Sequence, residues 1–296
     1  MSSVLIGYLR LMRPANLPTA AADIFAGVAL AGLFSASTNV LPIVIPILFL
    51  IFSSIFLYAG GVVLNDVFDV EVDKIERPER SLPSGLIPLK SAAFFGAILL
   101  LIGIALAFLV NNLSGIIAIL LALSIVLYDG YSKKYDFLGP LNMGFCRSLN
   151  LLLGVSILME FFHWEYAFIP LVYIFAITLI SRGEVHGNNK NHIFWAGLLY
   201  AAVIISVVIM ATIKNSNVLQ TIPFLVLFAF LVYKPLVGAY KHNSAQNIKK
   251  AVISGVLSLV VLDAAIAAGY TAWWYPILLL LLLPLSIFLS KLFAVT

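Results

Sequence analysis

The chain has 296 residues, of which 62% are hydrophobic and only 10% charged, and its mean hydropathy is +1.10. A soluble domain of this size needs far more polar surface, so the composition predicts a membrane protein with several spans. The net charge of +4 does not indicate nucleic-acid binding, because the basic residues lie between apolar segments, and the single cysteine, Cys146, excludes an intrachain disulfide.

Apolar segments follow one another along the whole chain, and each approaches the roughly 20 residues that a helix needs to cross the hydrocarbon core. In chain order we expect them at residues 17–34, 42–65, 91–110, 113–128, 138–159, 166–181, 193–213, 218–237, 251–270 and 274–293. The first segment contains Asp23 and many spans follow it, so it is interpreted as a retained helix and not as a signal peptide. The predicted fold is all-α, a single transmembrane helical bundle over residues 1–296.

The basic residues predict the orientation of this bundle. With the N-terminus inside, the outer loops contain only Lys214 and the fifth segment contains Arg147, so fifteen of the 17 Lys and Arg residues lie on the inner side. This positive-inside pattern predicts a multi-pass protein of the cell (inner, cytoplasmic) membrane with a cytoplasmic N-terminus. It also favours ten crossings, because Lys291 then lies inside. The alternative is a last segment lying at the interface, anchored by the aromatic residues 273–275.

Three aspartates follow the second segment at positions i, i+3 and i+7: Asp66, Asp69 and Asp73. On one helix this spacing places the carboxylates along a single face, within about 10 Å of helix axis. Carboxylates this close repel one another unless a cation lies among them, and hard oxygen ligands suit Mg²⁺, which is often shared with phosphate. Arg77 and Arg80 then complement the anionic oxygens of a substrate. The alternative interpretation is a solvated acidic helix end balanced by basic neighbours.

This stretch resembles the first Asp-rich motif of the UbiA superfamily of intramembrane prenyltransferases. The matching residues are Asn65, Asp66, Asp69, Asp73, Arg77, Pro78, Arg80, Pro83, Ser84 and Gly85. The resemblance continues, in helix order and loop position, to about residue 271. It implies nine core helices, with the last apolar segment as an additional C-terminal span. It also implies that the aspartates are catalytic, through Mg²⁺ and an isoprenyl diphosphate, and that Asn65 contacts the substrate.

By the same resemblance, the second motif of the superfamily falls on the loop after the sixth segment. Ser181, Glu184 and Asn188 occupy positions that are commonly acidic, so the spacing is kept while three carboxylates are reduced to one. We expect Glu184 and Asn188 to contribute oxygen ligands to Mg²⁺, and Arg182 and His186 to meet diphosphate oxygens directly. The alternative is a polar turn between two helices. This loop and the extra C-terminal span also resemble the ebo-cluster UbiA-like proteins, which are associated with export of secondary metabolites.

Two further segments are expected on the same inner side. The loop 128–136 resembles a superfamily loop in which a tyrosine precedes a basic residue, and it predicts that Lys133 reaches the diphosphate. The alternative is ordinary positive-inside charge. The segment Arg13–Pro14 resembles the N-terminal Arg-Pro segment of the superfamily, which predicts that Asn16 lines the substrate pocket. A simple helix-entry role for Asn16 is the alternative.

Asp23, Arg147 and Asp263 lie inside apolar segments, where charges must face the bundle interior and be paired or hydrated. Arg147, with Asn150 one turn later, is predicted to point toward the substrate cavity. Asp23 or Asp263 is the expected partner for Arg147, and for Asp263 we favour a purely structural role.

The function predicted from the sequence is Mg²⁺-dependent transfer of an isoprenyl group from an allylic polyprenyl diphosphate to a small-molecule acceptor, aromatic or lipid, within the membrane. Metal and cations stabilise the departing diphosphate, and a water-poor cavity protects the allylic cation. The alternative is a UbiA-like non-enzymatic protein that binds an isoprenoid or secondary-metabolite precursor, or helps it to cross the bilayer. The weakened second motif is the main support for this alternative.

Overall fold

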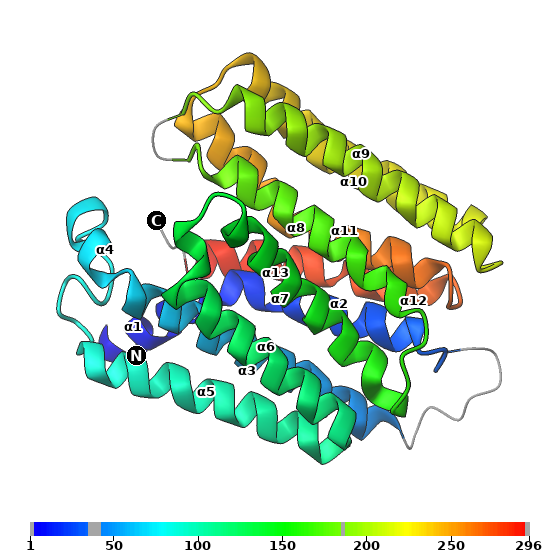
Figure 1. Ribbon diagram of the computed structural model, residues 1–296, viewed down its shortest axis with the longest axis horizontal. Helices are drawn as coiled ribbons and strands as arrows, with labels where there is room; N and C mark the ends of the chain where they lie inside the picture. The colour runs from blue at the N-terminus through cyan, green and yellow to red at the C-terminus, as the bar shows by residue number, and fades with distance from the viewer. Residues whose placement is uncertain (1–2, 35–42, 185–186, 294–296) are drawn as a thin grey trace.

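The computed structural model describes residues 3–34, 43–184 and 187–293, and in these residues it consists of helices and the turns between them (Figure 1). Nine helices of the described chain are long and apolar enough to cross a membrane. Helices are the natural solution for such segments, because a backbone in lipid must satisfy its own hydrogen bonds. The chain is therefore a multi-pass integral membrane protein, as its composition predicted.

The long helices begin and end within a few residues of the predicted segments, and the short helices α1 and α4 lie outside those segments. In chain order they are α1 (Ser3–Leu11), η1 (Pro14–Asn16), α2 (Leu17–Leu30), α3 (Val44–Phe68), α4 (Val70–Glu76), α5 (Leu89–Val110), α6 (Asn112–Gly130), η3 (Ser132–Lys134), α7 (Leu138–Val155), η4 (Ser156–Leu158), η5 (Trp164–Ala167), α8 (Phe168–Ser181), α9 (Lys190–Ile213), α10 (Val218–Lys241), α11 (Ala245–Ala268), α12 (Trp274–Leu280) and α13 (Leu282–Leu292). Helix α1 was not predicted, because its nine residues are too few to register as a span.

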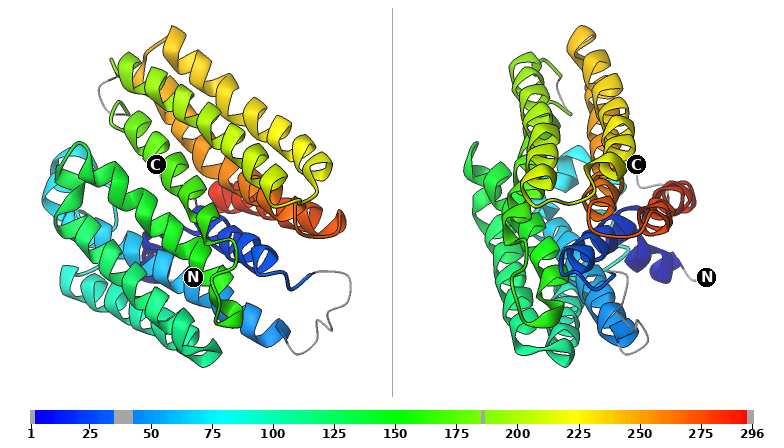
Figure 2. Two further views of the ribbon diagram at one scale, coloured as in Figure 1. Left: turned by 45° about the vertical axis from the view of Figure 1, so that its right-hand side comes forward. Right: turned by 90° about the vertical axis from the view of Figure 1, so that its right-hand side faces the viewer.

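The bundle has two halves that meet at α2. Helices α3, α5, α6 and α7 pack on one side of it, and α8, α9, α10 and α11 form the other half (Figure 2). Helix α2 contacts α3, α7 and α11, while α7 also contacts α8, so the halves are joined through α2 and α7. Each half has its own apolar core. The joint between the halves is where the cavity described below is found.

Helix α2 is short for a membrane span, with 14 residues, and it is almost completely buried. Small residues let it approach α7 closely: a Cβ atom added to Gly27 would lie 2.7 Å from the Val155 nitrogen, and one added to Gly154 would lie 2.7 Å from the Ile24 oxygen. Small residues at such crossings are how helices in membranes gain close packing. The contact fixes the polar residues of α2 and α7 against each other.

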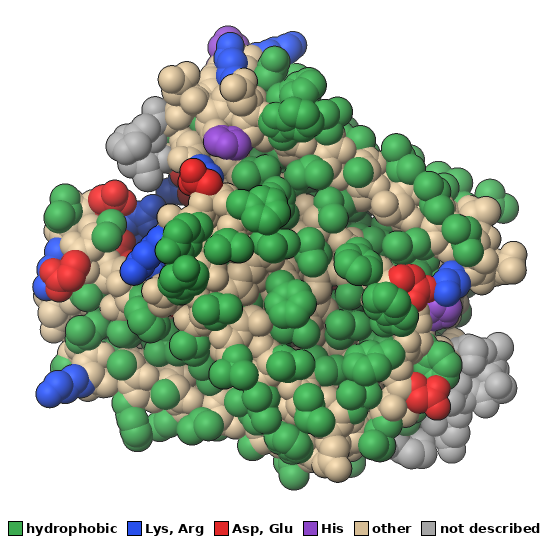
Figure 3. All heavy atoms as spheres, viewed as in Figure 1, with side chains coloured by type: hydrophobic (Ala, Val, Ile, Leu, Met, Phe, Trp, Pro, Cys, Tyr) green, Lys and Arg blue, Asp and Glu red, His purple; other side chains and the backbone are tan. Residues whose placement is uncertain are grey.

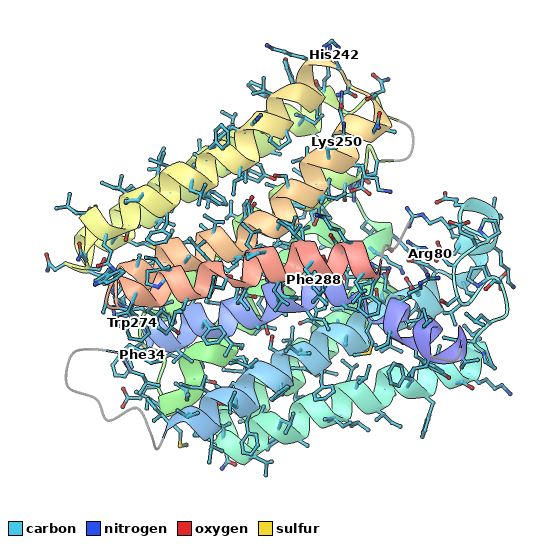
Figure 4. All side chains as sticks on the ribbon, turned by 180° about the vertical axis from the view of Figure 1, so that it is seen from behind. Phe34, Arg80, His242, Lys250, Trp274 and Phe288 are labelled. Atoms are coloured by element: carbon cyan, nitrogen blue, oxygen red, sulfur yellow. The ribbon has the colours of Figure 1, made fainter. Side chains whose placement is uncertain are left out.

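The additional C-terminal span is present. Helices α12 and α13 are separated by a turn at Leu281 and together form one membrane-spanning segment, Trp274–Leu292. This segment runs lengthwise beside α2 and α11 (Figure 4). At one end the ring of Trp274 lies 6.5 Å from that of Phe34, centroid to centroid. The segment is thus long and apolar enough to be the predicted extra span, and it is one of nine candidate spans in the described residues, where the charge pattern favoured ten crossings.

The outer surface separates into an apolar flank and charged ends. Hydrophobic side chains cover most of the visible flank, and the charged side chains gather near its two ends (Figure 3). The larger charged group surrounds α4, at the end of the bundle where α1 also lies. The Asp-rich motif is therefore at one end of the bundle, where the spans leave the hydrocarbon region, and not at its mid-depth.

Candidate active site

The three aspartates of the first motif lie where α3 passes into α4. The prediction of one unbroken helix is wrong at Asp69, where φ is −93° and ψ is 4°. A short polar residue favours such a helix end, and the break turns Asp69 toward Lys133, whose Nζ is 2.6 Å from Asp69 Oδ1. Two backbone hydrogen bonds nevertheless keep the helical register: the Asp69 N–H donates to the Asn65 carbonyl, and the Asp73 N–H donates to the Asp69 carbonyl. Asp66 and Asp73 therefore still share one side, and both are buried.

Basic side chains from three separate segments hold these carboxylates. Arg80 Nη1 lies 2.8 Å from Asp73 Oδ2 and 3.4 Å from Asp66 Oδ1. Arg13 Nη2 lies 2.5 Å from Asp66 Oδ1, and the Arg13 backbone takes a left-handed conformation with φ of 48°. That conformation is unfavourable for a residue with a side chain, and the ion pair with Asp66 anchors it. The acids are thus balanced by cations that come from before η1, after α4 and from η3.

The cavity lies beneath this charged cluster, between the two halves of the bundle, and has a volume of about 390 Å³. Asn16, Asn65 and Arg13 line it beside the cluster, and Ser54 lines it further along α3. Asn65 and Ser54 are eleven residues apart, which corresponds to about 16 Å of helix. The rest of the wall is largely apolar, with residues from α6, α8 and α11 such as Leu121, Ile177 and Val256. The cavity therefore combines a charged mouth with an apolar chamber.

The loop of the second motif lies across the mouth from α4. Glu184 is partly buried; burial raises the pKa of its carboxyl group, opposed by the nearby charges of Arg77 and Lys249. Ser181 lines the cavity. Asn188 is exposed, with φ of 56°, whereas its neighbour Asn189 is buried and donates hydrogen bonds to the carbonyls of residues 179 and 180. The side of the loop that faces the mouth thus carries Glu184 and Ser181.

Arg182 of this loop, which was predicted to meet the diphosphate, is paired elsewhere. Arg182 forms an ion pair with Asp136, whose side chain is 97% exposed, and donates a hydrogen bond to the Tyr135 carbonyl. His186 lies outside the described residues. Arg182 therefore ties the second-motif loop to the loop before α7, and its guanidinium is not directed at the cluster of aspartates as we expected.

Arg147 lines the inner part of the cavity, as does Asn150. The Nε of Arg147 is 2.6 Å from Asp23 Oδ2, and its Nη2 donates to the Thr19 carbonyl. Asn150 donates to the same Asp23 oxygen at 2.7 Å and accepts a hydrogen bond from Ser54. The carboxyl group of Asp263 lies near that of Asp23. Asp23 is therefore the direct partner of Arg147, and Asp263 is a second neighbour.

The structure thus brings most of the predicted residues to one place. The cluster contains Asp66, Asp69, Asp73, Arg80 and Lys133, with Arg77 near Glu184, and the cavity wall contains Asn16, Asn65 and Arg147. Arg13 and Asp129 were not assigned to the site from the sequence, although both line the cavity. The sequence offered one signal for each: Arg13 precedes a proline, and Asp129 lies in the same loop as Lys133. A single charged residue at a helix end is too common to indicate a site.

Comparison with known sequences shows a family match over most of the chain. Residues 25–234 match the UbiA prenyltransferase family. A digeranylgeranylglyceryl phosphate synthase from Methanococcoides burtonii is 41% identical over 154 residues, which is 51% of this chain and 54% of that protein. The chain therefore spans about half the length of this curated relative.

Solved structures share the fold over a greater length. A structure described as that of a digeranylgeranylglyceryl phosphate synthase in membranes superimposes with a TM-score of 0.67 and 24% identity, and covers 91% of this chain and 99% of its own. A UbiA homologue from Archaeoglobus fulgidus bound to GPP and Mg²⁺ superimposes with a TM-score of 0.68 and 14% identity, covering 88% and 99%. At these identities the likeness shows a common fold.

Proposed function

Because the chain belongs to the UbiA prenyltransferase family, we propose that it transfers an isoprenyl group from an allylic polyprenyl diphosphate to an acceptor within the membrane. The observation that supports this proposal is that a charged mouth opens into a largely apolar cavity of about 390 Å³. An allylic diphosphate has the same two parts, a strongly anionic headgroup and an apolar tail. The proposal treats residues 1–296 as one prenyltransferase domain.

Basic residues at the mouth bind the diphosphate in this proposal. Arg13, Arg80 and Lys133 each contact an aspartate within 2.8 Å, so their charged ends are already directed into the cluster. Guanidinium groups match phosphate oxygens with two parallel hydrogen bonds. Asn16 and Asn65 lie on the cavity wall next to these cations, where they contact the reactive end of the donor.

The donor set at the mouth fits Mg²⁺. In the described part of the chain no group of three or more acidic, His or Cys side chains converges as a cage, but Mg²⁺ is usually bound by one or two carboxylates plus substrate phosphates. Asp66 and Asp73 share the Arg80 guanidinium and so lie close enough together to offer such a pair. Asp69 and Glu184 are further ligands in our proposal, and Asn188, being exposed, is a weaker one. Bound Mg²⁺ supplies positive charge that stabilises the departing diphosphate.

The residues of the chain complete the chemistry. The cations at the mouth neutralise the diphosphate as the bond to the allylic carbon breaks, which is where charge develops in the transition state. The apolar wall around Leu121, Ile177 and Val256 excludes water, which otherwise quenches the allylic cation. The acceptor then reacts inside the cavity. The name of the curated relatives describes a glyceryl phosphate with two geranylgeranyl groups, so a glyceryl-lipid hydroxyl is the first acceptor to examine.

We also propose that the mouth faces the cytoplasm. The supporting observation is the sequence pattern of Lys and Arg: with the N-terminus inside, fifteen of 17 fall in the predicted inner loops, which include the segments that form the mouth. The protein then takes its donor at the cytoplasmic face of the inner membrane, and surrounding lipid is its third partner after the diphosphate and the acceptor.

A binding protein without turnover is the second candidate. The observation in its favour is that Asp66, Asp69 and Asp73 are all paired with Arg or Lys side chains, so the site is charge-balanced without added metal. Such a protein holds an isoprenoid or metabolite precursor and helps it to cross the bilayer.

The decisive experiment uses the purified chain in lipid nanodiscs with labelled geranylgeranyl diphosphate, Mg²⁺ and geranylgeranylglyceryl phosphate or a membrane extract. We expect Mg²⁺-dependent product and diphosphate release, both abolished in Asp66→Ala and Asp73→Ala. Glu71→Ala is the matched control, because Glu71 lies on the exposed side of α4 and pairs with Lys74. Tight binding of the donor without diphosphate release would instead support the binding protein.

A further inference from the structure

Asp129 is a buried acidic residue in the cavity wall, and the mechanism described above does not use it. It is the penultimate residue of α6, only 3% of its surface is exposed, and it lines the cavity together with Asn65 and Arg13. Burying an ionisable group is unfavourable unless the group is paired. A carboxyl group at this position therefore needs either full pairing by its neighbours or a function.

The pairing of Asp129 involves one of its two oxygens. Asn65 Nδ2 donates to Asp129 Oδ1 at 2.7 Å, and Lys133 Nζ lies 3.9 Å from the same oxygen. Within the described residues, Oδ2 has no hydrogen-bond partner. The hydrogen bond from Asn65 orients the carboxyl group and leaves the second oxygen available to a molecule in the cavity.

The position of Asp129 relative to the mouth is equally specific. Asn65 is adjacent in sequence to Asp66, and Lys133 is simultaneously 2.6 Å from Asp69. The side chain of Lys133 thus lies between Asp129 and Asp69. Asp129 is on the cavity side of the charged cluster that binds the diphosphate in our proposal. In a prenyl diphosphate the reacting carbon is bonded directly to the diphosphate, so the acceptor atom must also arrive at this boundary.

We propose that Asp129 is the general base of the transfer reaction, acting on an acceptor hydroxyl group; the inference rests on the prenyltransferase function proposed above. The bond between the allylic carbon and the bridging oxygen breaks, and its electron pair leaves with the diphosphate. The acceptor oxygen forms the new bond to the allylic carbon, and its proton passes to Oδ2 of Asp129. The products are an ether, free diphosphate and a protonated Asp129, which returns its proton to water when the products leave.

The test is the Asp129→Asn variant, which keeps the size of the side chain and an oxygen that accepts the hydrogen bond from Asn65. Loss of a general base lowers rates by about 10²–10⁴-fold. We therefore expect transfer to geranylgeranylglyceryl phosphate to fall by about 10²-fold or more, while the affinity for labelled geranylgeranyl diphosphate and the Mg²⁺ requirement stay unchanged. Asp129→Glu, which keeps a base, should recover part of the rate. Asp136→Asn is the control, because Asp136 is an exposed acid of the neighbouring loop.

The pH profile provides a second readout. In the wild-type protein the rate should fall as the pH is lowered and the base is protonated, and this limb should disappear in Asp129→Asn. Other titratable groups surround Asp129 and interact with its charge. They are Lys133, Asp69, Arg13, Cys146 and Tyr128, which precedes Asp129 in the sequence. The comparison between the two proteins isolates Asp129, since these neighbours are common to both.

Two outcomes overturn the role of Asp129, and a third overturns the function on which it rests. Unchanged transfer in Asp129→Asn shows that the carboxylate takes no proton. Loss of donor affinity, or a raised Mg²⁺ requirement at an unchanged maximal rate, places Asp129 among the ligands of the diphosphate or metal. Absence of transfer in the wild-type protein with every acceptor overturns the proposed function itself, and so is distinct from a failure of Asp129.

Discussion

Arg80 reaches back from the loop after α4 to Asp73 within that helix, with 2.8 Å between Arg80 Nη1 and Asp73 Oδ2. The same nitrogen lies 3.4 Å from Asp66 at the end of α3. One guanidinium therefore connects two helices and the loop that follows them. The carboxyl groups of Asp66 and Asp73 are thereby held near the same guanidinium nitrogen.

Replacing Arg80 by Gln should weaken donor binding. A hydrogen bond to a charged group contributes about 1.5–3 kcal/mol, so the KM for the diphosphate should rise by roughly 10–150-fold. Arg80→Lys should recover only part of this, because an ammonium group cannot offer a phosphate two parallel hydrogen bonds as the planar guanidinium fork does. Initial rates at varied donor concentration measure the effect, with Lys90→Gln at the exposed start of α5 as the control. An unchanged KM would remove Arg80 from the donor site.

Removal of divalent metal with a chelator should abolish transfer, and added Mg²⁺ should restore it. Asp66→Asn should raise the Mg²⁺ concentration needed for half-maximal rate, because one carboxylate of the pair is lost. Asp69→Asn should have a smaller effect, since Asp69 is directed to Lys133. Titration of the rate with Mg²⁺ gives the ranking. Equal effects of the two substitutions would show that the ligand-bound site rearranges.

Ser181→Asp and Asn188→Asp should differ in effect, although both restore a carboxylate at a position of the second motif. Ser181 lines the cavity, so the new carboxylate should strengthen Mg²⁺ dependence. Asn188 is exposed and is the weaker ligand of our proposal, so Asn188→Asp should change the metal response less than Ser181→Asp does. The same Mg²⁺ titration compares them. A stronger response in Asn188→Asp than in Ser181→Asp would contradict this assignment of the loop.

Alanine at Gly27 or Gly154 should destabilise the contact between α2 and α7. Each new methyl group would lie 2.7 Å from backbone atoms of the facing helix, and overpacking of this kind costs about 1–3 kcal/mol. Gly238→Ala on α10 is the matched control, because no atom lies within 4 Å of a Cβ there. Thermal unfolding in detergent should show a lower midpoint for the first two variants and no loss for the third.

The pair of Asp23 and Arg147 should be strongly coupled. Removing one partner leaves an uncompensated buried charge, which costs about 3–5 kcal/mol, so Arg147→Gln and Asp23→Asn should each lower the unfolding midpoint. The double variant should be more stable than the sum of the two effects predicts, as a double-mutant cycle would show. Additive losses would indicate that the 2.6 Å contact contributes little.

The sequence was a good guide to the elements and a partial guide to the site. Apolar length predicted the spans because each lipid-facing helix must satisfy its own backbone, a constraint local to the segment. The spacing of Asp66 and Asp73 likewise depended on helix geometry alone, and the two residues do share one side. The break at Asp69 was missed because it accompanies a contact with Lys133, 64 residues away.

By itself, then, the sequence determined a helical membrane bundle and an acid-rich motif at one end of a span, because both follow from patterns within a few helical turns. Only the tertiary structure decided that Arg13 meets Asp66, that Asp23 and not Asp263 is the direct partner of Arg147, and that Asp129 lines the cavity. Those choices depend on which helices cross and how closely. The close approach of Gly27 and Gly154 sets one such crossing, and no single segment contains that information.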